Sequence, residues 1–383
     1  MTWRKPIGRG HARPLLGLGI VTLLLLTACN MGPRVLQGNR LDYNVNVQRS
    51  NNEELLVNLV RAKYLEPLFF LQVGSISSSF NFNVGANAQA TLFEKSRPGV
   101  PGVTNTYSAQ ASAGYAENPT ITYTPVQGEQ AVKQLLEEIT LDRFLLLTRA
   151  GWSIESLLWT IVLRIGELYN FDPQTSKGMG KPYLGFLELA NIFGRMQERG
   201  DLELVAVGKE GKGILQLRYI DADEAAKVES LLGVKRERLT TPEGRIFSRI
   251  TLTPVRDLVS GRGPQERDVE VPIKLKSCFE VLYDLSWSVE APKSHMEKGL
   301  TTKAPVLPHE LNALKGLHAG LVNVRSADSR PDAFVAIAYR GNWYYMPDDD
   351  VRSKAYFVLL GTLFALQAGE LRTVVPLLTL PVK

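Results

Sequence analysis

A strict alternation of apolar and small polar residues from position 80 to 92 constrains the fold of this chain more than any other feature. The apolar positions are Phe80, Phe82, Val84, Ala86, Ala88, Ala90 and Leu92. After a loop with two prolines and two glycines, the alternation returns at Tyr107, Ala109, Ala111, Ala113 and Tyr115. Because the side chains of a β-strand point alternately to its two faces, the pattern predicts a long β-hairpin over 79–117.

Both runs also have the length and pattern of membrane β-barrel strands, which need about 9–11 residues with aromatics near the two interfaces. Two strands cannot close a barrel, and an open edge in lipid would leave backbone groups unpaired. Insertion therefore requires at least about four protomers that share one barrel of about eight strands. The candidate membrane residues are Phe80, Phe82, Val84, Leu92, Tyr107 and Tyr115. The alternative is a soluble hairpin whose alanine-rich face packs on the protein's own helices.

The N-terminus has the pattern of a secretory signal, with Arg4, Lys5, Arg9 and Arg13 ahead of an apolar run at 15–26. The sequence Leu26, Thr27, Ala28 and Cys29 that ends this run resembles a bacterial lipobox. The resemblance implies cleavage after residue 28 and acylation of Cys29, so that the mature protein is anchored in membrane lipid. A short buried N-terminal helix followed by a core cysteine is the alternative.

The signal also accounts for most of the positive charge, because four of its basic residues leave +5 − 4 = +1 on the mature chain. A nearly neutral domain does not favour nucleic acid as a partner. Lipoproteins kept at the inner membrane usually carry Asp after the acylated cysteine, and this chain has Asn30 there. The resemblance to lipoproteins therefore implies delivery to the outer membrane, facing the periplasm of a Gram-negative-type bacterium.

The chain has only two cysteines, Cys29 and Cys278. If lipid occupies the first, no intramolecular disulfide can form, and the fold must depend on its hydrophobic core. Cys278 has helical spacing to apolar neighbours and is expected to be a buried small hydrophobe, with a reactive thiol as the alternative. After the signal, no run of 18 apolar residues predicts a transmembrane helix.

The predicted fold class is α+β. We expect a signal peptide at 1–28, a lipid-anchored tether at 29–50, a helical domain with the hairpin at 51–200, and a mixed, mainly antiparallel α+β domain at 201–383. A helix should begin at Asn51 or Asn52 and end before Pro67. Further helices are expected up to Leu168 and over 183–199, 221–232, 273–289 and 349–368, and strands over 68–73, 202–207, 214–219, 245–255, 321–325, 333–340, 343–346 and 373–382.

Several blocks together resemble a family of uncharacterised bacterial outer-membrane lipoproteins. They comprise residues 52–61, the Pro-Thr-Ile-Thr-Tyr-Thr-Pro segment at 119–125 with Gln127, Gly128 and Glu129, the pair Gly151 and Trp152, and residues 339–345 with 352–354. The resemblance covers most of the mature chain. It implies an envelope location and a shared fold, and it transfers no catalytic residue.

The residues offer no complete catalytic site. His295, His309 and His318 fall within one 24-residue region, but His309 and Glu310 open a metalloprotease-like pattern whose second histidine is replaced by Ala313. The acidic run 348–350 precedes a helix, where capping explains it better than a cation. The glycine-rich segment 208–213 lies between two strands and is explained as a turn. We therefore predict no cofactor, no metal and no enzymatic activity.

The sequence thus favours a non-catalytic outer-membrane lipoprotein that acts as a structural or assembly component of an envelope complex. Its expected partners are membrane lipid through acylated Cys29 and copies of itself or other envelope proteins. If the hairpin inserts, the oligomer would form an export channel. Two alternatives remain: a periplasmic metal-dependent hydrolase that uses the histidine region with Glu310, and a cell-wall-binding protein that uses Trp343, Tyr344 and Tyr345.

Overall fold

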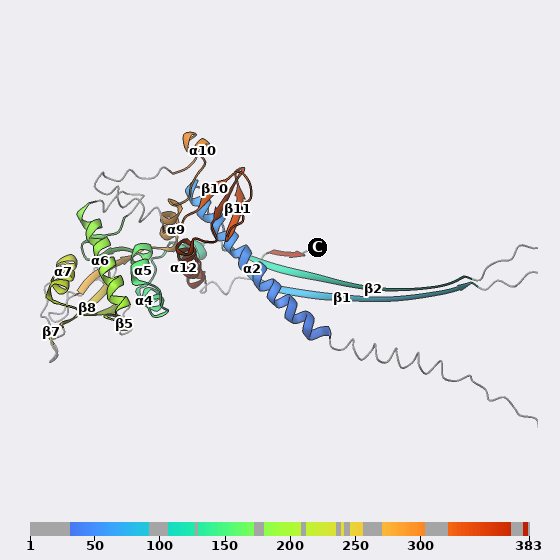
Figure 1. Cartoon of the computed structure of the whole chain (residues 1–383), viewed down its shortest axis with the longest axis horizontal. Coiled ribbons are helices and arrows are strands. Elements are labelled where there is room, and N and C mark those ends of the chain that lie inside the picture. The colour runs from blue at the N-terminus through green and yellow to red at the C-terminus, as the bar shows by residue number, and fades with distance from the viewer. Residues whose placement is uncertain are drawn as a thin grey trace, which may run out of the picture. The chain divides into compact units, whose positions relative to one another are not determined.

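The chain has an α+β fold, as predicted, in which helices alternate with mainly antiparallel strands (Figure 1). The computed structural model describes residues 31–91, 106–126, 129–171, 180–207, 212–234, 239–240, 246–255, 270–302, 321–368 and 378–381. The chain divides into two units, Met1–Leu55 and Leu56–Lys383. The lipobox residues Leu26, Thr27, Ala28 and Cys29 lie outside the described residues.

Helix α2, Met31–Lys63, contains all the described residues of the first unit. It begins far upstream of Asn51, so the expectation of an extended tether up to residue 50 is wrong for 31–50. Residues 39–52 contain neither proline nor glycine, and nothing in them ends a helix. Pro33 lies in the first turn, where its missing N–H costs nothing. An ion pair between Arg49 and Glu53 at 3.0 Å adds support one turn apart.

The sheet with the most strands among the described residues of the second unit is seven-stranded. Its strand order is β4 (Leu168–Tyr169), β3 (Val162–Ile165), β9 (Glu270–Leu275), β8 (Ile246–Pro254), β6 (Lys212–Tyr219) and β5 (Leu202–Val207), and β7 (Leu239–Thr240) also pairs with β8. All neighbouring strands are antiparallel except β8 and β9. The sheet is therefore mixed and mainly antiparallel, as the sequence predicted.

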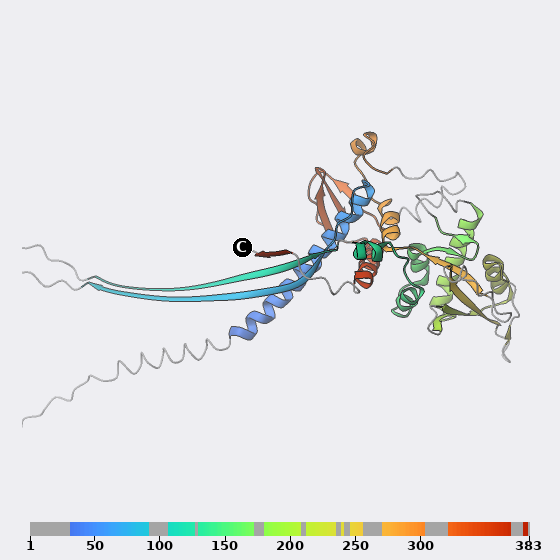
Figure 2. The same ribbon diagram turned by 180° about the vertical axis from the view of Figure 1, so that it is seen from behind.

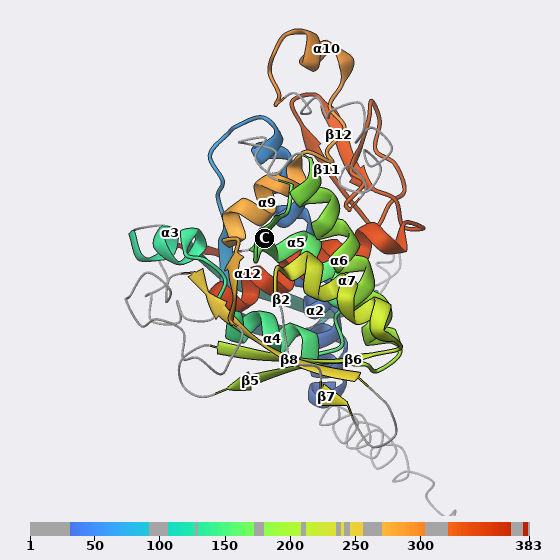
Figure 3. The same cartoon turned by 90° about the vertical axis from the view of Figure 1, so that its left-hand side faces the viewer.

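One face of this sheet is buried, because its apolar residues lie opposite one another. Leu215 pairs with Ile250, and Leu252 pairs with Val271, and all four are at most 2% exposed. Helices α4 (Leu141–Arg149), α6 (Lys181–Glu198) and α7 (Ala222–Leu232) pack on one side of the sheet (Figure 3). Gly213 permits close packing of α4, since a Cβ there would lie 3.3 Å from the Leu145 side chain.

This sheet contradicts the expected domain boundary at residue 200. Strands β3 and β4 come from the first half of the chain, and the others come from the second half. Helix α6 packs against strands from both halves. Residues Leu56–Lys383 therefore form one unit instead of a helical domain followed by an α+β domain.

The remaining helices are α3 (Glu129–Leu136), α5 (Ile154–Ile161), α9 (Cys278–Ser286), α10 (Lys293–Glu297) and α12 (Val351–Ala368). Helix α12 packs on α3 and α9 and buries Phe357, Leu359 and Leu360. A small antiparallel sheet has the order β10 (Arg325–Ala327), β12 (Asn342–Met346) and β11 (Val335–Tyr339). Arg340 and Gly341 form the tight turn between β11 and β12, and both have positive φ.

Two predicted helices are wrong in part. The helix expected to reach Leu168 ends at Ile161, where the β-branched and apolar residues that follow join the sheet as β3 and β4. The helix expected over 273–289 begins only at Cys278, because residues 270–275 form β9. Ser153 caps the N-terminus of α5, since its side chain accepts from the Ser156 N–H. Cys278 is fully buried, as expected.

The predicted hairpin is confirmed and is longer than expected. Strand β1 (Leu71–Thr91) pairs with β2 (Thr106–Pro125) along its whole length, and β13 (Leu378–Pro381) adds to the other edge of β2 (Figures 1 and 2). The strand expected at 68–73 therefore belongs to β1 from residue 71 onward, and its side chains are partly exposed instead of buried.

Candidate functional site

The two predicted apolar runs lie opposite each other in the β1–β2 ribbon. Phe82 pairs with Tyr115, Val84 with Ala113, and Ala90 with Tyr107. Directly opposed residues of an antiparallel pair share a face, so both runs form one apolar face and the asparagines, glutamines and serines form the other. Phe80 continues the apolar face opposite Glu117. Leu92 lies outside the described residues.

The distal ribbon, defined as 81–91 paired with 106–116, contains no charged residue and no proline. Its eleven residue pairs run from Asn81 with Ala116 to Thr91 with Thr106. At about 3.3 Å per residue and a tilt near 45°, this length spans roughly 25 Å. Phe82 and Tyr115 lie at one end of the apolar face, and Tyr107 lies at the other. Length, neutrality and aromatic ends together match a membrane-barrel hairpin.

Only β13 packs on this ribbon beyond isolated contacts, among the described elements of the second unit. It pairs with β2 from Leu378 opposite Tyr123 to Pro381 opposite Thr120, which is the end of β2 nearest the rest of the unit. No described helix of the second unit runs along the alanine-rich face. The described contacts therefore give no support to the alternative in which that face packs on the protein's own helices.

The buried amide of Asn58 fixes the base of the ribbon. Its Nδ2 donates to the Phe69 carbonyl at 2.7 Å, and its Oδ1 accepts from the Phe69 N–H at 2.8 Å. The Val126 N–H donates to the Phe70 carbonyl at 2.9 Å, which closes the ladder at its first residues. The ring of Phe70 lies 4.7 Å from that of Phe364 in α12. Residues 69 and 70, just before β1, are therefore held by side-chain hydrogen bonds and aromatic packing.

A hydrogen-bonded aromatic cluster lies beside this base, between the end of α2 and the small sheet. The Tyr64 hydroxyl is 2.6 Å from His295 Nδ1 and 2.5 Å from the hydroxyl of Tyr344, which is completely buried. Burial raises the pKa of both tyrosines, and their mutual hydrogen bond adds to this for Tyr344. Both hydroxyls therefore stay protonated and able to donate at neutral pH.

Glu66 completes the connection to the small sheet. Its carboxylate accepts from the Tyr339 hydroxyl and pairs with the Arg340 guanidinium. The same guanidinium lies 5.0 Å above the Tyr64 ring. Leu65 and Arg340 have φ of +55° and +49°, conformations that residues other than glycine seldom adopt. We call Asn58, Tyr64, Glu66, Tyr339, Arg340 and Tyr344 the base clamp.

Tyr64 and Glu66, just after the sequence block 52–61, contact residues of the block 339–345. The alternative of a cell-wall-binding surface at Trp343, Tyr344 and Tyr345 loses one member, because Tyr344 is completely buried and cannot present its ring to a sugar. Arg330 lies 5.4 Å above the Trp343 ring, which is partly exposed. His295 belongs to the clamp's hydrogen bonds, and His309, His318 and Glu310 lie outside the described residues.

A second candidate is a cavity of about 800 Å³ between α5, α6 and the start of α7. Glu155, Trp159, Asn191 and Arg195 line it from α5 and α6, and Asp223 and Lys227 line it from α7. Burial raises the pKa of Glu155, partly opposed by Arg352. Lys227 pairs with Glu188 at 2.9 Å, so part of the charge in the cavity is neutralised within it.

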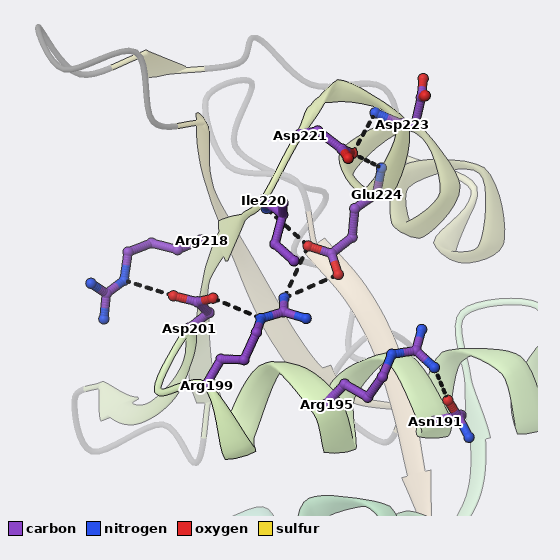
Figure 4. A network of polar contacts seen from close by, with 9 residues as sticks. All are labelled: Asn191, Arg195, Arg199, Asp201, Arg218, Ile220, Asp221, Asp223 and Glu224. Atoms are coloured by element: carbon purple, nitrogen blue, oxygen red, sulfur yellow. Dashed lines mark hydrogen bonds and ion pairs between the residues drawn. The ribbon is translucent and has the colours of Figure 1, made fainter.

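Figure 4 shows that the charged residues beside this cavity tie α6 to α7. Arg199, just after α6, lies 3.0 Å from Asp201 and donates to both oxygens of Glu224 at 3.0 and 3.1 Å. Asp221 caps α7 by accepting from the N–H groups of Asp223 and Glu224. These bonds make Arg199, Asp221 and Glu224 structural contacts between α6 and α7.

Within the part of the chain that the structure describes, no three histidine, cysteine, aspartate or glutamate side chains gather as a metal site. None of the helices among these residues is long and apolar enough to cross a membrane. Comparison of the chain with protein families, characterised proteins and solved structures finds no match.

Sequence reasoning missed the base clamp. Its residues are ordinary polar and aromatic types spread over 58–66 and 339–344, and no spacing rule connects segments so far apart. Two sequence features could have pointed to the clamp: the short separation between Asn58 and Phe69, and the Arg340-Gly341 turn. The separation matches no known motif, and the turn predicts only a hairpin.

Proposed function

We propose that the protein is an outer-membrane lipoprotein, anchored by acylated Cys29, whose hairpin inserts with those of other copies as a shared β-barrel. The observation that carries this proposal is the distal ribbon, which is uncharged, of membrane-spanning length, apolar on one face and covered by no described helix of its unit. The lipobox-like sequence adds an anchor that would bring the ribbon to a bilayer.

An isolated hairpin in a bilayer would have two unpaired strand edges. A two-stranded sheet in hydrocarbon leaves two rows of N–H and C=O groups without partners, each at a cost of several kcal/mol. A ring of hairpins removes every edge, and about four copies reach the usual minimum of about eight strands. In such a ring, Phe82, Val84 and the alanines would face lipid, and Asn83, Asn87 and Gln89 would face the lumen.

The lumen side chains would make a polar passage, so the role that fits is an export channel or a structural ring in an envelope complex. No catalytic step is included in this proposal. The rest of the second unit would remain in the periplasm, and the base clamp would hold each hairpin to it. This arrangement gives a reason why one end of the ribbon is fixed by buried polar contacts.

The proposal is tested with two lysine variants of the full lipidated chain at neighbouring positions. Ala88→Lys places a charge on the apolar face near the middle of the ribbon, where a lipid-facing lysine costs about 2–4 kcal/mol per copy. Asn87→Lys places the same charge on the polar face and serves as the matched control. On unboiled gels of detergent-extracted protein, the wild type and Asn87→Lys should give a heat-labile oligomer, and Ala88→Lys should lose it.

A second measurement uses the chain without its signal and with Cys29→Ser. A stable, fully soluble monomer whose hairpin amides are protected from hydrogen exchange would overturn the shared barrel, because the ribbon would then be ordered without lipid or neighbours. Equal behaviour of the two lysine variants would also contradict the proposal, since it predicts that the two faces differ.

A further inference from the structure

The outer edge of β2, the one that faces away from β1, is divided into two parts. Strand β13 covers it from Thr120 to Tyr123. Pro119 follows and has no N–H to donate, and Pro381 ends β13 opposite Thr120. Beyond Pro119, the described residues provide no strand other than β1 as a partner for β2. Positions 106–116 therefore form a separate distal edge.

β13 runs in the same direction along β2 as β1 does. Leu71 pairs with Pro125 and Thr91 with Thr106, so β1 rises as β2 descends, and β13 rises from Tyr123 toward Thr120 in the same sense. It therefore occupies, at the base of β2, the place that an antiparallel neighbour with the direction of β1 would take farther along. The edge of β2 thus already pairs with a strand of the orientation that a second copy would present.

The distal edges lack the features that usually prevent strand addition. Exposed edge strands are commonly protected by charges, prolines, bulges or short length, and 81–91 and 106–116 contain no charge, no proline and no register shift. The base has such features instead, namely Glu117, Pro119 and a register shift between Val73 and Ser75. The base of the ribbon thus has features that prevent strand addition, and the distal edges do not. This difference favours pairing of the distal edges with further strands.

The occupant that fits both edges is a second copy of this chain. One edge belongs to β1 and the other to β2, they have equal length, and they run in opposite directions. β1 of one copy can therefore pair antiparallel with β2 of the next, and the same contact repeated around a ring leaves no edge.

We propose that β1 of each copy pairs with β2 of its neighbour only along 106–116, and that β13 with Pro119 sets the lower limit of this contact. β13 then acts as a stop that fixes the register between copies, so that neighbouring hairpins cannot slide toward the base. This inference rests on the proposed shared barrel and adds the location of the contact and what limits it.

The test is disulfide cross-linking between two differently tagged copies of the full lipidated chain, produced together. One copy carries Asn87→Cys, and the other carries Ser108→Cys, Gln110→Cys or Gly114→Cys in turn, all on the polar face. The matched control near the ribbon's base combines Ser77→Cys in one copy with Thr120→Cys in the other, and β13 covers Thr120. We expect a cross-linked dimer for at least one distal combination and no cross-linked dimer for the combination near the base. Buried Cys278 is common to all variants.

Two further variants test the stop itself. A chain that ends at residue 377 lacks β13, and Thr379→Pro keeps the chain length but removes a donor from β13. In either variant, Ser77→Cys and Thr120→Cys of neighbouring copies should become cross-linked. If this cross-link forms in neither variant, the role of β13 is overturned. If it forms while β13 is intact, the limit at Pro119 is overturned.

The outcomes separate this inference from the proposed function. A heat-labile oligomer without any distal cross-link would show that copies meet through another surface, which overturns the inference and leaves the oligomer. Absence of both the oligomer and the cross-links would overturn the two together.

Discussion

The distal ribbon and the seven-stranded sheet are both antiparallel β structures, yet they obtain their stability in different ways. In the sheet, Leu215, Ile250, Leu252 and Val271 meet across strands and are covered by helices. On the apolar face of the ribbon, the opposed residues are mostly alanines, and no described helix of the unit covers them. The sheet therefore carries its own core.

This difference shows what the ribbon lacks. An isolated two-stranded hairpin is at best marginally stable in water, because it orders two strands and buries little apolar area. Among the described residues, the clamp and β13 hold the ribbon at one end. A partner for its faces and edges, either lipid or another copy, would supply the remaining stability.

The largest expected effect comes from matched truncations in the two regions. Ile250→Ala removes a fully buried side chain from the sheet and should lower the free energy of unfolding by about 2–5 kcal/mol. Val84→Ala in the ribbon should change it by less than about 0.5 kcal/mol, as at a site without packing. All tryptophans after the signal lie outside the hairpin, so tryptophan fluorescence during denaturant unfolding reports on the rest of the chain.

The same two variants also test whether the ribbon and the sheet differ in packing. A large effect of Val84→Ala on this unfolding transition would mean that the ribbon is packed against the rest of the protein. In the oligomer, however, Val84→Ala should lower the temperature at which the unboiled band dissociates, and Ile250→Ala in its separate layer should not. That contrast would show that the apolar face of the ribbon stabilises the oligomer.

The next effect is expected at the junction between the two regions. Asn58→Ala removes both side-chain bonds to the backbone of Phe69 in a fully buried position. Leaving that N–H and carbonyl unpaired should cost about 2 kcal/mol. Denaturant unfolding measures this loss, and hydrogen exchange at residues 69–73 should become faster. Asn52→Ala, on the same helix but not buried, is the control and should change neither.

The sequence predicted the ribbon well because its signal is local. Period-two alternation, small residues and two turn-rich ends specify a hairpin without reference to the rest of the chain, and the register found pairs Phe82 with Tyr115 as the pattern requires. The Gly-rich hairpin of β5 and β6, the cap at Ser153 and the burial of Cys278 were predictable for the same reason.

The failures concern long-range pairing. The segments 162–169 and 270–275 mix apolar with charged residues, and the pairing of Ile165 with Ile273 places both in the sheet. The same pairing joins the two halves of the chain and removes the expected boundary at residue 200. The base clamp depends on Tyr64 and Tyr344 meeting across 280 positions, which no local pattern encodes.

A smaller effect tests the buried core through alkaline pH. Burial raises the pKa of Cys278 to about 12, from an ordinary value of 9.0. A raised thiol pKa stabilises the folded state below the ordinary value, and this stability is lost as the pH rises toward 12. Between pH 8 and 10, unfolding free energy should fall by about 1 kcal/mol more in the wild type than in Cys278→Ala. Identical slopes in the two proteins would show that the thiol is accessible to water.

The smallest effect concerns Asp350, which caps the helix that supports the ribbon's base. Its carboxylate accepts from the N–H and the hydroxyl of Ser353, 3.0 and 2.7 Å away. Partial burial raises the pKa of Asp350, but these bonds, with Asn323 and Arg325, outweigh it and hold the pKa below 3.8. A lowered carboxyl pKa adds stability above the ordinary value, and this stability is lost as the pH falls through the folded-state pKa.

At pH 7, Asp350→Asn should cost at most about 1 kcal/mol, because the amide can still accept from the Ser353 N–H but lacks the carboxylate charge. The cost should become progressively smaller as the pH falls below 3.8. Asp349→Asn is the matched control, since that side chain is exposed and should change unfolding little at either pH. The same helix contributes Phe364, which packs on Phe70 at the start of the ribbon. If the base depends on this helix, hydrogen exchange at residues 70–73 should quicken in Asp350→Asn while exchange in β6 and β8 stays unchanged. Equal acceleration in the sheet would mean that the two regions unfold as one and do not differ in how they are held.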